Sequence, residues 1–336
     1  MAERYATIIG TGRYVPPIEV TNEDFKEKMA KVSPKLPEVV DKFEASSNIQ
    51  TRWYAPDDWA TSDLAVEAAK DALEDTGLKA EDLDMILLGT DSPDYITPAT
   101  SVVVQHKLGA TNAGTFDIGC ACASFPTGLV QAAGMLATNP HMKYVMVIGA
   151  YMMHKLADYE RDLMAFFYGD GAGAAILTAS DEPGFVSSTF FAQGSYHKHW
   201  GIYSGGTYEP ATPGSVEAGR TQVRFIEPFP PEVNNEGWPK RMRELAEHGD
   251  FDLQDVDLAI YTQVRLNSIK IVMEELGLPL ERAHWIMDKW GYTGSACLPM
   301  AFDDAREQGK VHASDLVTFV GSGVGYNQAG AAFVMP

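Results

Sequence analysis

The chain has 336 residues, of which 45% are hydrophobic and 21% are charged. This composition is typical of a globular protein with a substantial core, and the length predicts about two domains. The 46 acidic and 26 basic side chains give a formal net charge of −20. Such an acidic balance argues against a nucleic-acid-binding surface and against a cationic membrane-binding face.

The cysteines and the N-terminal sequence indicate the cellular compartment. Three cysteines, Cys120, Cys122 and Cys297, are too few for a disulfide framework and favour a reducing environment. The start, MAERYATIIGTG, lacks the charged and apolar regions of a signal peptide, and no apolar run is long enough to span a membrane. No Cys/His cluster has the spacing of a zinc site. We therefore expect a cytoplasmic protein without a metal.

The N-terminal half alternates β-rich runs with helical patterns. A first helix is expected to begin after Thr21 or Asn22, where acidic residues follow a capping side chain. Further helices are predicted at Ser62–Thr76, Val102–Leu108 and Pro126–Ala137, and strands at Ala6–Gly10, Leu83–Thr90, Gly114–Ile118 and Tyr144–Gly149. The segment Phe166–Thr178 is predicted to be a glycine-rich turn that leads into another strand. Alternating strands and helices indicate βαβ units.

The C-terminal half partly repeats this order. Strands are predicted at Asp257–Thr262, Trp285–Asp288, Leu316–Val320 and Ala331–Met335, and helices at Ser268–Leu276 and Ser295–Gln308. The repetition suggests a duplicated α/β fold with halves at residues 1–178 and 179–336. The segment 188–238 is rich in glycine, proline and aromatic residues and fits neither period. It is either a functional loop or a solvent-exposed insertion.

Cys122 is the best candidate for a nucleophile. It lies in the segment FDIGCACASFP, between a predicted strand and a predicted helix. A thiol at a helix N-terminus experiences the positive end of the helix dipole, which favours the thiolate. Its small neighbours would allow close approach of a substrate. The alternative is that Cys122 is a small buried residue without a reactive role.

Two glycine-rich stretches and one histidine are further candidates. The stretch Gly321–Gly325 could direct backbone N–H groups at a developing oxyanion, or it could be a plain turn. Gly169–Gly173 lacks the spacing of a dinucleotide site and precedes a strand, which favours a structural turn. His199, beside Trp200 in the irregular middle, is either a base or part of a solvated loop.

Several segments, in the correct order, resemble the β-ketoacyl-ACP synthase III family of the thiolase superfamily. They are IIGTGRYVP and VTNEDF near the start, FDIGCACASF around Cys122, FYGDGAGAAIL in mid-chain, and DKWGYTGSACLP near the end. The resemblance implies a duplicated five-layered α/β/α/β/α sandwich. It also implies a homodimer and a tunnel for the pantetheine arm of acyl-CoA or acyl-carrier protein, leading to Cys122 as the reactive thiol.

Two residues depart from the family pattern in the region that the resemblance assigns to catalysis. The family places a His in Pro-His-Gln-Ala-Asn and an Asn thirty residues later in Gly-Asn-Thr. This chain has Thr262 within YTQVR and Tyr292 within GYT, and the two residues are also 30 apart. The unchanged separation indicates genuine substitutions, so Thr262 and Tyr292 are the candidate catalytic partners of Cys122.

The substitutions remove hydrogen-bond donors from the family's reaction. Thr262 is a weak neutral donor that cannot act as a base near pH 7, and Tyr292 can donate one hydrogen bond. Because each lost oxyanion donor costs on the order of 2.7–4 kcal/mol, decarboxylative condensation should be poor. Backbone N–H groups near Cys122 and Val324 are carried over from the family as the oxyanion hole that serves acylation of the cysteine. Gly323 and Gly325, beside Val324, are expected to bind substrate.

Other departures concern substrate binding. The family's segment that clamps the adenine of CoA is replaced by KFEASSN at residues 42–48. A basic residue of the family's carrier-docking helix is replaced by Asn267, which leaves Arg265 and Lys270 nearby, and the bulky gate at the tunnel floor is replaced by Thr97. We expect Thr97, Asn267 and the loop residue His199 to contact substrate.

Four functions remain open at this point. The leading hypothesis is an acyltransferase that forms an acyl-enzyme at Cys122 and passes the acyl group to a small acceptor, without a bound cofactor. Deprotonation would come from the substrate, Asp288 or a residue such as His199. The alternatives are a non-standard carbon–carbon condensing enzyme and a non-catalytic subunit that pairs with a paralogous ketosynthase; a thioester hydrolase is less favoured.

Overall fold

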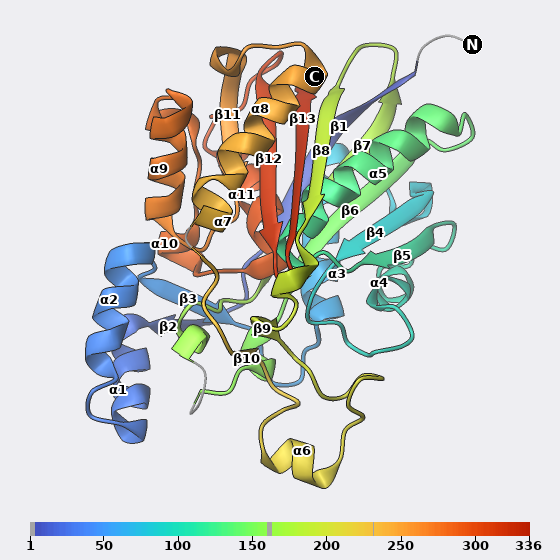
Figure 1. Ribbon diagram of the computed structural model, residues 1–336. Coiled ribbons are helices and arrows are strands. Elements are labelled where there is room, and N and C mark those ends of the chain that lie inside the picture. Colours follow the sequence, from blue (N-terminus) through green and yellow to red (C-terminus); the bar gives the residue numbers. More distant parts are fainter. Residues whose placement is uncertain (1–3, 160–162, 231) are drawn as a thin grey trace.

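Two β-sheets form the centre of the computed structural model, which describes residues 4–159, 163–230 and 232–336 (Figure 1). The first sheet contains β1 (Tyr5–Tyr14), β4 (Met85–Gly89), β5 (Gly114–Ile118), β6 (Tyr144–Tyr151) and β7 (Gly171–Ser180), in the order β1-β7-β6-β4-β5. The second contains β8 (Phe185–Ala192), β11 (Val256–Tyr261), β12 (Leu316–Gly323) and β13 (Asn327–Val334), in the order β11-β12-β13-β8.

The strand pairing of the second sheet repeats that of the first. β1–β7 and β7–β6 are antiparallel and β6–β4 is parallel; likewise β8–β13 and β13–β12 are antiparallel and β12–β11 is parallel. In the second sheet, the place that β5 has in the first is taken by an isolated parallel bridge between Ala259 and Ala283. This repetition supports internal duplication. The predicted boundary between residues 178 and 179 falls inside β7 and stays a prediction.

Helices complete five layers. The outer face of the first sheet is covered by α3 (Thr61–Thr76) and α4 (Thr100–Leu108). Between the sheets lie α5 (Ser124–Thr138) and α11 (Cys297–Glu307), and the outer face of the second sheet carries α8 (Gly237–Gly249) and α9 (Leu266–Leu276) (Figure 1). The five-layered α/β/α/β/α sandwich implied by the resemblance is therefore confirmed.

Smaller elements gather at the end of the sandwich where Cys122 lies. A two-stranded sheet pairs β2 (Ile18–Thr21) with β3 (Thr51–Tyr54), and α1 (Asn22–Val32) and α2 (Pro37–Ser47) lie between these strands in the sequence. In its described residues, the segment predicted to be irregular, 188–238, contains the end of β8, the start of α8, the 3-10 helix Gly194–Tyr196 and four further short elements. These are β9 (Trp200–Gly201), α6 (Pro213–Glu217), β10 (Arg224–Phe225) and α7 (Glu232–Asn235).

One predicted strand is wrong. Trp285–Asp288 does not extend the second sheet; instead α10 (Met287–Trp290) begins there. The ladder to β11 ends with the hydrogen bond from His284 N–H to the Ala259 carbonyl. Two residues further on, Ile286 N–H donates to the side-chain oxygen of Gln263 at 2.9 Å. A side-chain acceptor thus turns the chain away from the sheet.

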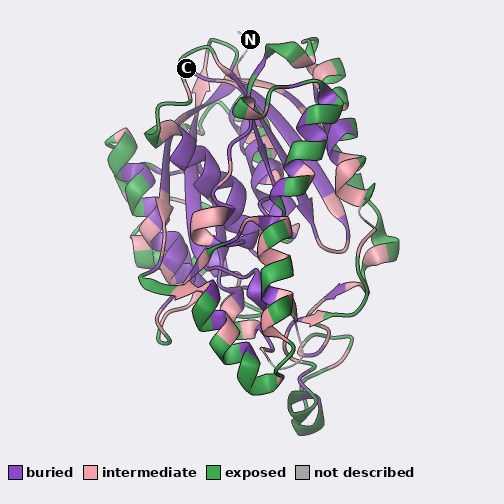
Figure 2. Ribbon diagram, turned by 90° about the vertical axis from the view of Figure 1, so that its left-hand side faces the viewer, coloured by how far each residue is buried: buried purple, intermediate pink, exposed green. Residues whose placement is uncertain are grey.

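The central strands and the inner helix α11 are the most deeply buried parts of the molecule. α11 is buried from Cys297 to Ala305, and Figure 2 shows the burial concentrated on the sheets and the helices between them. Exposed residues lie on the outer helices and on the arm that carries α6. Within the described part of the chain, no helix is both long enough and apolar enough to cross a membrane.

Glycines allow the inner helices to approach the strands closely. A Cβ atom at Gly149, on β6, would lie 2.1 Å from the carbonyl oxygen of Ser295, just before α11. In the other half, a Cβ atom at Gly321, on β12, would lie 2.6 Å from the carbonyl oxygen of Cys122, just before α5. Both contacts are with backbone atoms that cannot move aside like a flexible side chain. The start of each inner helix is therefore pressed against the sheet of the opposite half.

We predict that Gly149→Ala lowers the free energy of unfolding by about 1–3 kcal/mol, because an added methyl group must displace the backbone at Ser295. Urea denaturation followed by circular dichroism measures this change. The matched control is Gly134→Ala in α5, where an added Cβ meets no atom within 4 Å. That variant should be stabilised by about 0.4–1 kcal/mol. Equal stability of both variants would contradict the close-approach argument.

Candidate active site

Cys122 lies where the chain passes from β5 into α5. The residues Ala121–Ala123 form a short 3-10 helix, in which Ala121 has a φ of 47°, and α5 begins at Ser124. The Ser124 hydroxyl accepts from the backbone N–H of Cys120 and donates to the Ile118 carbonyl, each at 3.0 Å. The small side chains permit this tight turn, and the serine fixes it. Cys122 is only 1% exposed.

Tyr292 contacts the thiol directly. Its Oη atom makes a hydrogen bond with the Sγ atom of Cys122. The tyrosine is held by its backbone, since its N–H donates to the Phe167 carbonyl at 2.8 Å and its carbonyl accepts from Gly169 N–H at 2.9 Å. Its ring also packs against Tyr151, with ring centroids 5.9 Å apart. The predicted pair Cys122 and Tyr292 is thus brought together at one point.

Burial controls the ionisation of this pair. It raises the pKa of the Cys122 thiol well above its ordinary value, and the adjacent Cys297 and the charge of Asp91 act in the same direction. The Tyr292 hydroxyl acts in the opposite direction. Burial also raises the pKa of Tyr292, so this hydroxyl stays protonated. Burial thus opposes the thiolate that the helix N-terminus was expected to favour.

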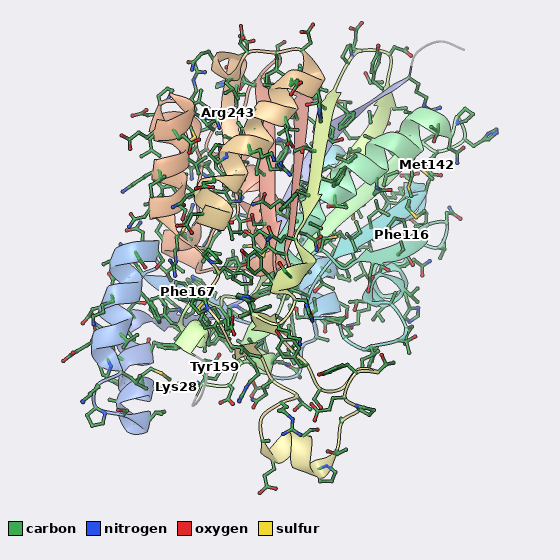
Figure 3. The ribbon with its side chains drawn as sticks, in the orientation of Figure 1. Lys28, Phe116, Met142, Tyr159, Phe167 and Arg243 are labelled. Carbon is green, nitrogen blue, oxygen red and sulfur yellow. The ribbon has the colours of Figure 1, made fainter. Side chains whose placement is uncertain are left out.

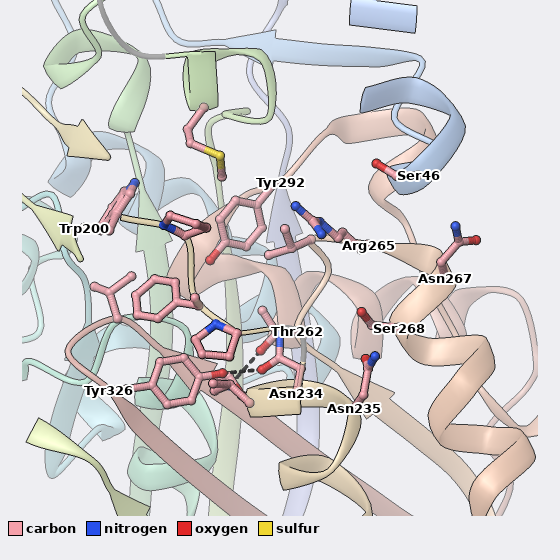
Figure 4. A pocket seen from close by; sticks show the side chains of 18 of the residues that line it. Ser46, Trp200, Asn234, Asn235, Thr262, Arg265, Asn267, Ser268, Tyr292 and Tyr326 are labelled. Atoms are coloured by element: carbon pink, nitrogen blue, oxygen red, sulfur yellow. Dashed lines mark hydrogen bonds between the residues drawn. The ribbon is translucent and has the colours of Figure 1, made fainter. Parts of the chain in front are cut away.

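A cavity of about 310 Å³ leads to Tyr292 (Figure 4). Of the predicted site residues, Thr262, Tyr292, Val324 and Asn267 line it. Figure 4 shows Ser46, Arg265, Asn267 and Ser268 along one side, and the aromatic rings of Trp200, Tyr292 and Tyr326 along the other. Cys122 lies behind Tyr292, so the tyrosine stands between the cavity and the thiol.

Thr262 is buried in the cavity wall. Its Oγ1 accepts a hydrogen bond from the backbone N–H of Ser322 at 2.8 Å. The Ser322 hydroxyl in turn accepts from the indole N–H of Trp238 at 2.5 Å. The Thr262 oxygen is thus engaged as an acceptor, which leaves its single proton as a donor.

The structure places His199 and Thr97 outside the cavity lining. The His199 ring stacks on Phe229, with centroids 5.2 Å apart, and Phe229 lines the cavity, so His199 lies behind its wall. A direct base or substrate-contacting role for His199 in this cavity is therefore not supported. Thr97 is exposed in the loop before α4. Its neighbours Tyr95 and Ile96 are also exposed.

Gly323 and Gly325 do not line the cavity; they allow backbone arrangements that a larger residue would prevent. A Cβ atom at Gly323 would lie 2.0 Å from the Cys120 carbonyl oxygen, so the glycine permits contact between β12 and the loop before Cys122. Gly325 has a φ of 116°, which favours glycine. It belongs to the turn that carries Tyr326 into the cavity wall, where the Tyr326 hydroxyl donates to Asn234.

The segment that replaces the family's adenine clamp is part of α2. Phe43 packs against Phe166 and Phe167, with ring centroids 5.5 and 4.9 Å apart. Figure 3 labels Phe167 beside the helices α1 and α2. Phe43 is therefore not free to stack on a nucleotide base. Ser46, on the same helix, lines the cavity.

Sequence reasoning missed three polar residues beside the thiol: Asp91, Tyr151 and Ser295. Ser295 donates to Asp91 Oδ1 at 2.8 Å. Tyr151 is fully buried, and its hydroxyl has no hydrogen-bond partner among the described residues. Asp91 follows β4 at the carboxyl end of a parallel strand, where sites of α/β folds gather. That position was the signal that could have revealed it.

We predict that Tyr292→Phe slows alkylation of Cys122 by iodoacetamide by about 10-fold near pH 8, because the hydroxyl that lowers the thiol pKa is removed. The pH dependence of alkylation, followed by peptide mass spectrometry, measures the change. Tyr326→Phe is the matched control, since its hydroxyl binds Asn234. Faster alkylation of the Tyr292 variant would show that the hydroxyl shields the sulfur instead.

Comparisons with known proteins agree with this geometry. Residues 116–194 match the family model "3-Oxoacyl-[acyl-carrier-protein (ACP)] synthase III", and residues 246–335 match the model of its C-terminal part. Beta-ketoacyl-[acyl-carrier-protein] synthase III of Natranaerobius thermophilus is 33% identical over 328 residues, covering 95% of this chain and 96% of that protein.

Solved structures of the same family have the same fold. The synthase III structure from Thermus thermophilus superposes with a TM-score of 0.87 at 27% identity, covering 98% of this chain and 99% of the other. The structure from Aquifex aeolicus gives a TM-score of 0.84 at 27% identity, with the same coverage of 98% and 99%. This chain therefore belongs to the β-ketoacyl-[acyl-carrier-protein] synthase III family of acyl-transferring condensing enzymes.

Proposed function

We propose that this chain is an acyltransferase that works through a thioester on Cys122. The sulfur attacks the carbonyl carbon of an acyl thioester, and the donor's pantetheine thiol leaves. A small acceptor then attacks the new thioester and releases Cys122. The observation that carries the proposal is the buried Cys122 thiol, hydrogen-bonded by Tyr292 at the inner end of the cavity. The small-residue turn around Cys122 supports a catalytic chain over a non-catalytic subunit.

The neutral residues at positions 262 and 292 favour transfer over decarboxylative condensation. Thr262 accepts from Ser322 N–H, so it offers at most one weak donor to an enolate. Tyr292 already binds the Cys122 sulfur. A malonyl enolate would thus lack two strong donors, each worth on the order of 2.7–4 kcal/mol. Backbone N–H groups of Cys122 and Val324 are the proposed donors to the tetrahedral intermediate of acyl transfer.

The cavity supports a pantetheine thioester as the donor. Ser46, Asn267 and Ser268 provide hydrogen-bonding groups for the amides of a pantetheine arm, and Arg265 provides a positive charge (Figure 4). Both CoA and an acyl-carrier protein present this arm. The net charge of −20 opposes docking of an acidic carrier, so we favour CoA. Cytoplasmic location and assembly as a homodimer or with a paralogue stay predictions.

Acylation of Cys122 tests the proposal. We expect the intact mass to increase by one acyl group after incubation with at least one of acetyl-, malonyl-, medium-chain or aromatic acyl-CoA, because Cys122 is the proposed acceptor of the donor's acyl group. Cys122→Ala should abolish the increase, whereas Cys120→Ala should retain it. The same panel on an acyl-carrier protein distinguishes the two donor classes. No Cys122-dependent increase with either class would contradict the proposal.

Release of CO2 from malonyl-CoA tests the interpretation of the two substitutions. We expect Thr262→His combined with Tyr292→Asn to increase release by about 10-fold or more over the unmodified chain, because donors to the enolate are restored. The control carries the same two substitutions together with Cys122→Ala. Release by the unmodified chain that equals or exceeds release by the double variant would show that Thr262 and Tyr292 support decarboxylation.

A further inference from the structure

The loop after β4 holds Asp91 in a fixed position. On one side, the Thr61 hydroxyl of α3 donates to the Ser92 carbonyl at 2.5 Å. On the other, the Ser92 hydroxyl accepts from the backbone N–H of Met152, just after β6, at 2.9 Å. The backbone next to Asp91 is thereby tied to both α3 and the end of β6. This anchoring fixes where its carboxyl group can lie.

The carboxyl group of Asp91 is in contact with the segment that surrounds the thiol. Ser295 donates to Asp91 Oδ1 at 2.8 Å and lies in the 3-10 helix Gly294–Ala296. Tyr292, three residues before Ser295, contacts the Cys122 sulfur. Cys297, two residues after Ser295, also interacts with that thiol. Ser295, which binds the carboxyl group, is therefore only two or three residues from the side chains that touch the sulfur.

The groups that face this carboxyl are neutral. They are Tyr151 from β6, Tyr292 and Ser295 before α11, and Cys122 before α5. Burial raises the pKa values of Cys122, Tyr151 and Tyr292. Among the described residues, no cation forms an ion pair with Asp91. Burial raises the pKa of Asp91 to about 6, although the Ser295 hydroxyl opposes this shift.

The cavity itself offers no proton acceptor suited to neutral pH. Its described lining contains no Asp, Glu or His, and its titratable side chains are Arg265 and three tyrosines. His199 packs behind Phe229, and Asp288 lies in α10, outside the lining. A base for the transfer step must therefore lie outside this lining, and Asp91 is the carboxyl group that contacts the segment around the thiol.

We propose that Asp91 is the general base of the transfer step and that the acceptor is a protic molecule, an alcohol or an amine. This inference rests on the proposed acyl transfer. As the acceptor's oxygen or nitrogen bonds to the acyl carbon, its proton passes to the Asp91 carboxylate. The carbon–sulfur bond breaks, and its electron pair stays on Cys122. The proton then moves from Asp91 to the sulfur, which restores the thiol and the carboxylate.

The test separates the two half-reactions in the full-length protein. Acyl-Cys122 enzyme is prepared with a donor found by intact mass, and its decay is followed in water, ethanolamine and hydroxylamine. Asp91→Asn should slow decay in water and ethanolamine by about 100-fold, because a general base typically contributes 10²–10⁴-fold. Hydroxylamine, a nucleophile that does not need a base, should react at a rate within about 3-fold of the unmodified chain. The matched control is Asp94→Asn on the same loop.

The pH profile distinguishes a catalytic from a merely structural role. Decay in ethanolamine should rise as the pH increases through about 6 in the unmodified chain, where Asp91 loses its proton, and this rise should be absent in Asp91→Asn. An unchanged profile in the variant, or equal slowing with all three nucleophiles, would overturn the base role alone. Failure of every donor to acylate the unmodified chain would instead overturn the proposed function, and the base role with it.

Alkylation by iodoacetamide checks the placement of Asp91 without any acyl donor. The carboxylate charge raises the pKa of the Cys122 thiol. Asp91→Asn should therefore shift the alkylation profile to lower pH and accelerate alkylation near pH 8, whereas Asp94→Asn should leave it unchanged. Coinciding profiles for the unmodified chain and Asp91→Asn would show that the carboxyl is not beside the sulfur and would overturn the proposal.

Discussion

The close approach of each inner helix to the sheet of the opposite half is the constraint on which the site depends. Gly149 and Gly321 lack the Cβ atoms that would strike the carbonyl oxygens of Ser295 and Cys122. The two helix starts consequently meet between the sheets. Cys122 comes from the first half, and Tyr292 and Ser295 come from the second. Neither half contains the site alone, so its geometry is only as firm as the packing of the two halves.

Local signals predicted the parts of the site that one segment defines. Small residues between a strand and a helix identified Cys122, and the 30-residue separation placed Thr262 and Tyr292 on one cavity. Asp91 and Ser295 escaped prediction because they are 204 residues apart and meet only through packing of the two halves. His199 illustrates the opposite error. A titratable side chain in an aromatic segment suggested a base, but its ring is used in stacking on Phe229.

The difference between local signals and contacts made only by packing also explains which elements of the fold were predicted. Hydrophobic periodicity predicted most inner strands and helices because burial selects for it. It failed at Trp285–Asp288, where the Gln263 side chain accepts from the Ile286 N–H and the ladder ends.

The position of Asp91 also works against folding. Because burial raises its pKa above that of an exposed carboxyl, its ionisation is unfavourable in the folded chain. This penalty is full above about pH 6 and declines as the carboxyl takes up a proton below it. A charge kept without a cation at such a cost is expected where chemistry needs it.

The substitutions at positions 262 and 292 therefore redistribute roles around the sulfur. With Thr262 and Tyr292 in place, the described lining holds no carboxyl or imidazole group, so a thioester can enter without meeting such a base. Tyr292 both covers the thiol and forms a hydrogen bond with it, which couples exposure of Cys122 to movement of one ring. Proton transfer is left to Asp91, whose pKa is raised by burial to about 6, in the range that suits a base at neutral pH. A protic acceptor needs this base and needs no enolate donors. Loss of the imidazole and amide from the cavity and the presence of the Asp91 carboxyl near the sulfur are then two aspects of one specificity for acyl transfer.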